Sequence, residues 1–212
     1  MAVTGTGTEV GKTLAATMLS LGLEACYWKP MQTGGDSDRG YAESRGVKTM
    51  PEAYKFDLPA APAAAGRVEK LEIPSLQAPL LIEGAGGALV PIRDKYLWAD
   101  WLAESALPTF LVARLYLGCI HHTLATVESL QKRGVKIIGL IFNDGKGDFG
   151  PSFPDSETRS TVLDGSRAFI VDYTGLPDLG RIPALINDDA STLRAIFERE
   201  VAPRLQNVEG FY

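Results

Sequence analysis

The sequence predicts an α/β fold of three layers, in which a mostly parallel central sheet carries helices on both faces. Short stretches rich in apolar residues, such as 80–82 and 136–142, alternate along the chain with segments of helical spacing. Short, wholly apolar strands are typical of the buried centre of a parallel sheet. The 212 residues suffice for one sizeable core, and no linker or internal repeat divides them, so we expect a single domain over 1–212.

The first thirteen residues predict a strand, a phosphate-binding loop and the start of a helix. An apolar start (1–3) leads into a Gly/Thr-rich loop that ends in Gly11-Lys12-Thr13, and apolar residues then recur at helical spacing. Loop N–H groups and a helix N-terminus together bind nucleotide phosphates. We expect Lys12 to contact the outer phosphates and Thr13 to ligate Mg²⁺. The alternative is a chance glycine-rich turn, since five residues, not the usual four, separate the outer glycines.

The remaining elements are predicted from periodicity and from turn residues. We expect strands at 25–28, 80–82, 109–112, 136–142 and 179–182, and helices at about 39–47, 94–104, 123–132 and 191–205. Pro62 should open a short alanine helix, and Ser191 should cap the last helix. Residues 168–171 fit a strand or a helix, and helix is favoured. The polar, glycine-rich stretches 31–38 and 145–154 are predicted to be loops.

Composition excludes several classes of function. A net charge of −5 argues against a general nucleic-acid binder, and the absence of a long uncharged apolar run argues against a membrane span. We expect Cys26 and Cys119 to be reduced core residues. His121 and His122 would point about 100° apart on a helix, which disfavours a zinc site. Because the first strand begins at Met1, we expect no cleaved leader and a cytoplasmic enzyme or switch.

Glu83 follows a wholly apolar predicted strand. An unpaired carboxylate in a dry site would cost several kcal/mol, so Glu83 needs a partner. A Mg²⁺ ion shared with Thr13 would provide one, and the glycines after Glu83 would let the backbone approach a nucleotide. The alternative is a glutamate that simply reaches solvent.

Lys29 and two aspartates follow another predicted strand. The Lys29 ammonium would stabilise charge that develops in phosphoryl or acyl transfer, although a solvated lysine is the common alternative. Asp36 and Asp38 would add a carboxylate to the metal, or would only shape a turn. In parallel sheets, ligands bind outside the carboxyl ends of the strands, where all these residues are expected.

Together these motifs resemble one family, dethiobiotin synthetase, the ATP-dependent ring-closing enzyme of biotin synthesis. In chain order they are TGTGTEVGKT (4–13), KPMQTG (29–34), Ser37-Asp38, the turn Pro59–Pro62, EGAGG with LVPI (83–92), WADW (98–101), LGCIHHT (117–123), FND (142–144) and GRIP (180–183). The match covers nearly the whole chain, and the five-residue glycine spacing is that family's own variant. The resemblance implies a P-loop NTPase-like fold.

The resemblance also implies a reaction and a site. 7,8-Diaminononanoate, CO₂ and ATP would give dethiobiotin, ADP and phosphate through a carbamate and a carbamic-phosphoric anhydride. Lys29 and Lys12 would be catalytic, and Thr13, Asp38 and Glu83 would hold Mg²⁺. Residues implied to contact ATP are Glu9, Val10, Gly11, Lys12, Thr13, Leu14, Asp38, Glu83, Gly84, Ala85, Gly86, Asn143, Asp144, Pro183, Ala184 and Leu185. Residues implied to bind the substrate are Thr8, Thr33, Leu117, Gly118, Cys119 and Ile120. The turn 117–120, at a helix N-terminus, would take the substrate carboxylate across a homodimer interface.

Some positions depart from the family pattern. Gly7 stands where an aspartate is usual, His121 replaces an asparagine, and the first helix and the segment 62–80 are short. The main alternative function is a P-loop ATPase switch or partner-binding module of the partitioning type. Such ATPases carry an extra lysine early in the loop, and residues 3–10 contain none. A second alternative is a related amide- or ring-forming synthetase with another substrate. A third, a non-catalytic relative, is disfavoured because the expected catalytic and metal-binding residues all remain.

Overall fold

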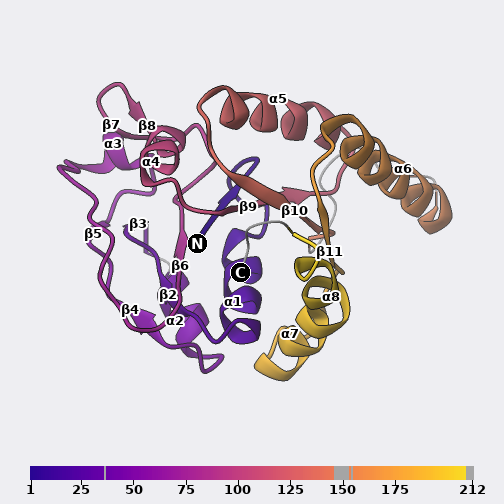
Figure 1. The fold of residues 1–212 in the computed structure, drawn as a ribbon, viewed down its shortest axis with the longest axis horizontal. Coiled ribbons are helices and arrows are strands. Elements are labelled where there is room, and N and C mark those ends of the chain that lie inside the picture. The colour runs from indigo at the N-terminus through magenta and orange to yellow at the C-terminus, as the bar shows by residue number, and fades with distance from the viewer. Residues whose placement is uncertain (36, 146–152, 154, 209–212) are drawn as a thin grey trace.

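A seven-stranded sheet forms the centre of the protein (Figure 1). The computed structural model describes residues 1–35, 37–145, 153 and 155–208. The strand order is β11-β10-β9-β1-β6-β2-β4, and the neighbouring strands pair in parallel. The strands are β1 (Ala2–Gly5), β2 (Cys26–Trp28), β4 (Thr49–Met50), β6 (Leu80–Glu83), β9 (Thr109–Arg114), β10 (Ile137–Asn143) and β11 (Asp178–Ile182).

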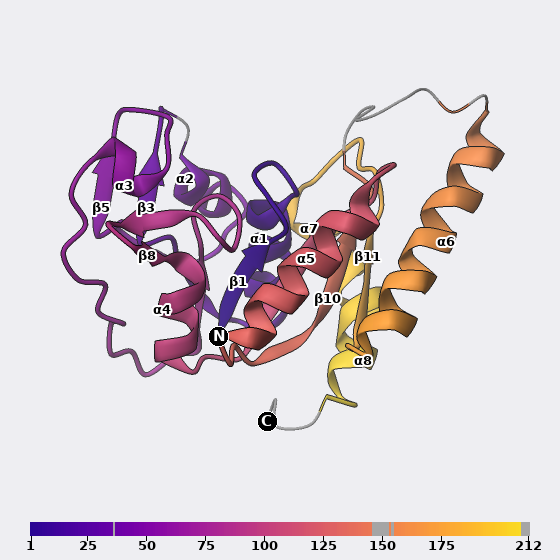
Figure 2. The same cartoon turned by 90° about the horizontal axis from the view of Figure 1, so that it is seen from above.

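Helices cover both faces of this sheet (Figures 1 and 2). One core contains residues of α4 (Trp98–Ser105), α5 (Cys119–Lys132) and α6 (Ser156–Thr174). The other contains residues of α1 (Lys12–Gly22), α2 (Asp38–Glu43), α7 (Ala190–Ile196), a π-helical turn (Phe197–Val201) and α8 (Ala202–Leu205). Strand residues alternate between the two cores: Leu111 joins the first, whereas Phe110 and Val112 join the second. The predicted three-layer α/β fold is therefore confirmed.

Two small sheets lie outside the predicted pattern. β3 (Met31–Thr33) pairs in parallel with β5 (Tyr54–Phe56), so the prediction of a loop over all of 31–38 is wrong. β7 (Pro91–Arg93) pairs antiparallel with β8 (Tyr96–Leu97). The helix predicted from residue 94 therefore begins only at Trp98. Lys95, at φ 50°, makes a left-handed turn between the two strands, which a helix cannot pass through.

Other predicted boundaries also shift. α2 ends at Glu43 instead of residue 47, and α5 begins at Cys119, four residues before its predicted start. Asp189, not Ser191, caps α7, because its carboxylate accepts the N–H of Thr192 at 2.8 Å. The predicted last helix is divided by the π-helical turn, since a proline at 203 has no N–H to donate to the turn before it.

Several local predictions are confirmed. Pro62 opens the short helix α3 (Pro62–Ala65), and residues 168–171 lie inside α6. Residues 66–79 form neither helix nor strand, which agrees with the short connection expected before β6. The predicted loop 145–154 lies mostly outside the described residues. In the part of the chain that is described, no helix is long and apolar enough to cross a membrane.

Candidate active site

The phosphate-binding loop connects β1 to α1, as the sequence predicts. Glu9 and Gly11 have positive φ angles of 58° and 94°. A Cβ on Gly11 would overlap the side-chain amide of Asn143, which donates to the carbonyl of Val10 at 2.9 Å. The Asn143 Oδ1 also accepts the N–H of Gly145 at 3.0 Å. Asn143, at the end of β10, therefore holds the phosphate-binding loop through the Val10 carbonyl, a role that the sequence did not predict.

Lys12 folds back onto the loop. Its ammonium donates to the carbonyl of Gly7 at 2.8 Å, and the residue is buried. Burial lowers the pKa of Lys12 to about 8 and outweighs the attraction of Glu83. A bound anion would raise this pKa again, so Lys12 is suited to a ligand that carries negative charge.

Thr13, Asp38 and Glu83 converge at the start of α1. The Thr13 hydroxyl oxygen lies 3.0 Å from Asp38 Oδ1 and 2.8 Å from Glu83 Oε1. Glu83 is 1% exposed, so it is not a glutamate that simply reaches solvent. A hydroxyl has one proton, which can serve only one of the two carboxylates.

This oxygen set fits a hard divalent cation. Mg²⁺ commonly takes one or two carboxylates and completes its coordination with phosphate oxygens and water. The described residues hold no group of three or more His, Cys, Asp or Glu side chains placed to bind a metal. Two carboxylates with a hydroxyl at a phosphate-binding loop match Mg²⁺ better than a metal that needs an all-protein cage.

Lys29 is the fourth member of this cluster. Its ammonium contacts Asp38 Oδ2 and lies 3.3 Å from Glu83 Oε1. The residue is buried, so the interpretation as a solvated lysine is wrong. Burial alone would lower the pKa of Lys29, but the charges of Glu83 and Asp38 outweigh it and raise the pKa. Lys29 is therefore a buried ammonium beside the loop that keeps its proton at neutral pH.

A cavity of about 580 Å³ extends from this cluster to the ends of β10 and β11. Its volume lies within the range of small-molecule sites. Predicted nucleotide contacts that line it are Glu9, Gly11, Thr13, Leu14, Asp38, Asn143, Pro183 and Leu185. Tyr41, Arg114 and Asp188 also line it and were not predicted. Asp188 ties the cavity wall to α2 and to the turn after it, because its carboxylate accepts from Tyr41 of α2 at 2.9 Å and from Arg45 beyond α2 at 2.6 Å.

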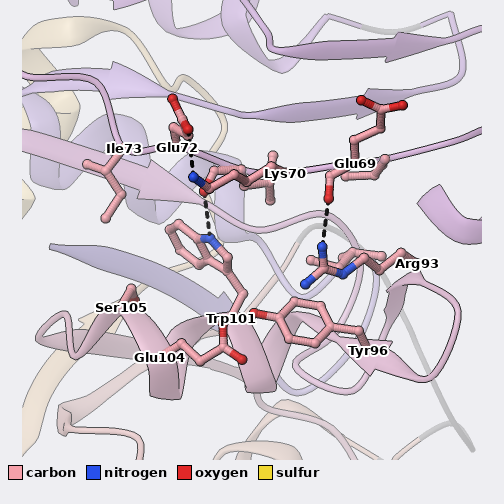
Figure 3. A pocket seen from close by; sticks show the side chains of 12 residues that line it. Glu69, Lys70, Glu72, Ile73, Arg93, Tyr96, Trp101, Glu104 and Ser105 are labelled. Atoms are coloured by element: carbon pink, nitrogen blue, oxygen red, sulfur yellow. Dashed lines mark hydrogen bonds and ion pairs between the residues drawn. The ribbon is translucent and has the colours of Figure 1, made fainter.

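A larger groove of about 770 Å³ lies elsewhere, between residues 68–73 and α4 (Figure 3). There Arg93 donates to the carbonyl of Glu69 and Trp101 to that of Leu71, while the Tyr96 hydroxyl donates to Glu104. None of the predicted site residues lines this groove. Size alone therefore does not identify the active site.

Comparisons with known proteins agree with this geometry. A family model described as an AAA domain matches residues 1–191. Curated relatives named ATP-dependent dethiobiotin synthetase BioD are 35% identical in Rhodopseudomonas palustris and 38% identical in Rhizorhabdus wittichii. The alignments cover 95% of this chain, and 94% and 95% of those relatives.

The chain belongs to the dethiobiotin synthetase family.

The relatives' names describe an ATP-dependent synthetase, so the predictions of family and of an ATP-dependent ligase are confirmed. The predicted P-loop NTPase-like fold agrees with the sheet and with the family model. Among solved structures, a ParA family ATPase from Chlorobium tepidum TLS covers 96% of this chain and 91% of its own, at 14% identity and a TM-score of 0.48. No functional conclusion follows from a likeness of that level.

Other residues implied by the dethiobiotin synthetase resemblance lie around the cavity rather than in its lining. The run 84–87 lies beside β1 and the phosphate loop: the N–H of Gly84 donates to the carbonyl of Val3 in β1, and a Cβ on Gly87 would lie 3.1 Å from Gly7 in the loop. Three further residues implied to contact ATP do not line the cavity. Val10 is in the core, Asp144 accepts a hydrogen bond from Arg181 at 2.6 Å, and Ala184 is exposed to solvent.

The residues implied to bind the substrate occupy three separate elements. Thr8 is exposed and lines a second cavity, of about 340 Å³, on the phosphate loop, and Thr33 ends β3. In the turn before α5, Leu117 is 49% exposed and Gly118 has φ 108°. Cys119 is buried, and its N–H donates to the carbonyl of Tyr116. Ile120, half-buried, packs against the core on that side of the sheet.

Two of the family departures, Gly7 and His121, lie at positions without close packing. A Cβ on Gly7 would meet only Val10, at 3.8 Å, so the backbone at this position has space for a Cβ. His121 is exposed near the start of α5, with its ring 5.5 Å from that of His122. Asp36, a candidate metal ligand from the sequence, lies outside the described residues. Cys26 is half-buried and Cys119 buried, and both are free thiols.

Proposed function

We propose that this protein is an Mg²⁺-dependent enzyme of biotin biosynthesis that converts 7,8-diaminononanoate, CO₂ and ATP to dethiobiotin, ADP and phosphate. The observation that carries the proposal is the cluster of Lys29, Thr13, Asp38 and Glu83 at the phosphate-binding loop. It unites a buried cation and two carboxylates where a nucleotide's outer phosphates would lie. The names of the relatives support the same reaction.

The reaction has three bond-forming steps. One amine of the substrate adds to CO₂ and loses a proton, which gives a carbamate. A carbamate oxygen then attacks the γ-phosphorus of ATP, and ADP leaves. In the last step the second amine attacks the carbonyl carbon of the carbamic-phosphoric anhydride, phosphate leaves, and the cyclic urea closes with loss of a proton.

The two lysines provide positive charge for these steps. Lys29 stays protonated and would stabilise the negative charge of the carbamate and of the phosphoryl group in transfer. Lys12 would exchange the carbonyl of Gly7 for phosphate oxygens. Thr13, Asp38 and Glu83 would hold Mg²⁺, which when bound neutralises phosphate charge.

The rest of the site would bind the two substrates. Asn143, Pro183 and Leu185 line the far end of the cavity, where we place the adenine. Thr8 and Thr33 would contact the diamine. The turn Leu117–Ile120 would bind the substrate carboxylate, since the first N–H groups of α5 favour an anion. In this proposal a second copy of the chain supplies that turn, where Leu117 is accessible to a partner copy.

The alternative, a partitioning-type ATPase switch, is less supported. Residues 3–10 contain no lysine, and the curated relatives are named as synthetases.

Isotope incorporation tests the proposal. With ¹⁴C-bicarbonate, label should enter an acid-stable product only when 7,8-diaminononanoate and Mg-ATP are both present, with one ADP released per product. Omitting the diamine is the control. If ATP hydrolysis proceeds equally without the diamine and no label is fixed, the synthetase proposal is wrong and the switch is favoured.

A further inference from the structure

Tyr27 lies beside Glu83 because of the register between two central strands. β2 pairs with β6 so that Tyr27 is opposite Leu81, and Glu83 follows two residues later on the same face of the sheet. The Tyr27 hydroxyl donates to Glu83 Oε2 at 2.7 Å. Tyr27 is 0% exposed and belongs to the same core as α1, the helix that carries Thr13.

The two oxygens of the Glu83 carboxylate have different partners. Oε1 lies next to the Thr13 hydroxyl and the Lys29 ammonium, whereas Oε2 accepts from Tyr27. The bond from Tyr27 therefore fixes the rotation of the carboxylate about its last side-chain bond. Oε1 is left facing the phosphate-binding loop.

We propose that Tyr27 is a positioning residue, which orients Glu83 so that Oε1 is available to a divalent cation. The inference rests on the proposed function, because it concerns the same Mg²⁺ site. Groups that orient metal ligands typically change metal affinity or activity 10- to 100-fold when they are removed. Tyr27 would act only through Glu83 and would not touch substrate or nucleotide.

The Tyr27 hydroxyl is available as a donor near neutral pH. Burial and the negative charge of Glu83 raise the pKa of Tyr27 well above its usual value, so the hydroxyl keeps its proton. A phenylalanine at this position would retain the packing of the ring and remove only the donor. A purely structural tyrosine would then affect thermal stability and leave cation binding unchanged, so the two roles can be separated.

The test measures Mn²⁺ binding to the protein with ADP by electron paramagnetic resonance. Tyr27→Phe should weaken Mn²⁺ binding by about tenfold or more, and ADP affinity without metal should change less than about twofold. The matched control is Tyr96→Phe, since Tyr96 also donates to a carboxylate, that of Glu104, in the groove of Figure 3. This control should bind Mn²⁺ like the wild type.

Two further variants test whether Tyr27 acts through Glu83. In a Glu83→Gln background, adding Tyr27→Phe should weaken Mn²⁺ binding less than about twofold, because the carboxylate that Tyr27 orients is already absent. Tyr27→4-aminophenylalanine keeps the ring and a donor, so it should restore most of the Mn²⁺ affinity even if Tyr27→Phe folds poorly. Unchanged Mn²⁺ affinity in a folded Tyr27→Phe protein, or an equal loss in Tyr96→Phe, would overturn the inference.

Wild-type dethiobiotin formation is measured separately. If the wild type binds Mn²⁺ with ADP but makes no dethiobiotin, the proposed reaction fails and the Mn²⁺ comparison still decides the role of Tyr27. If the wild type binds no Mn²⁺ in the presence of ADP, the inference about Tyr27 is overturned.

Discussion

Replacing Gly11 with alanine should destabilise the phosphate-binding loop by a predictable amount. Gly11 has φ 94°, and its Cβ would overlap the amide of Asn143. A left-handed conformation costs a non-glycine residue about 1–2 kcal/mol. Displacing Asn143 would leave the Val10 carbonyl without its donor, which costs about 1–3 kcal/mol when the group is buried. We therefore expect Gly11→Ala to lower the free energy of unfolding by about 2–5 kcal/mol.

Thermal and urea unfolding measure this loss, and two other glycines provide controls. The melting temperature should fall by roughly 4–20 °C for a chain of this size. Gly46→Ala, at φ 77° with nothing within 4 Å of the Cβ, should show the backbone strain alone, about 1–2 kcal/mol. Gly7→Ala has neither strain nor a close neighbour and should be almost neutral. If Gly11→Ala costs no more than Gly46→Ala, Asn143 does not support the loop as described.

Three more predictions concern charged residues. Lys29→Ala should lower kcat by about 10²–10³-fold, while the affinity for ADP stays within about twofold. Full activity of this variant would exclude the proposed role of Lys29. The control is Lys132→Ala, because the Lys132 side chain is exposed. Lys12 has a lowered pKa of about 8, so the unfolded chain binds more protons than the native one between about pH 8 and 10.5. Wild-type unfolding free energy should therefore rise with pH by about 1–3 kcal/mol relative to Lys12→Met in that window, and parallel pH profiles would contradict this. Arg45→Ala should weaken ADP binding by about tenfold, because Asp188 in the cavity wall loses its ion pair and its backbone hydrogen bond with Arg45, although it keeps the hydrogen bond from the Tyr41 hydroxyl. Arg39→Ala, whose partners are Glu43 and Glu52, should bind ADP normally in isothermal titration.

The acidic group at the end of β6 was predictable because its chemistry is local. A carboxylate after Leu80-Leu81-Ile82 has to find a partner wherever the strand lies, and Glu83 is indeed buried among donors. For Lys29, at the end of β2, the local sequence favoured a solvated lysine, and only the family resemblance pointed to a role in the site. The fold class followed from the alternation of apolar strands and helical segments.

Residues whose role depends on a distant neighbour were not predictable. Tyr27 meets Glu83 only because β2 pairs with β6 in the observed register, and neither segment alone shows which strand becomes its neighbour. Asp188 meets Arg45 across 143 positions of sequence. The turn at Lys95 was not predicted, because the apolar residues around it have helical spacing. A lysine in the left-handed conformation cannot be recognised from the sequence.

The candidate site combines elements of different local stability, and its least stable element is the six-residue helix α2. Thr13 and Glu83 lie on α1 and a central strand, whereas Asp38 lies on a short peripheral helix that also carries Tyr41 and ends two residues before Arg45. Short elements with few buried contacts open with less free energy than a central sheet. A nucleotide that bridges α1 and α2 would raise the stability of α2 most, because binding stabilises only the closed form. Hydrogen exchange of the α2 amides would then report nucleotide occupancy more sensitively than the global melting temperature.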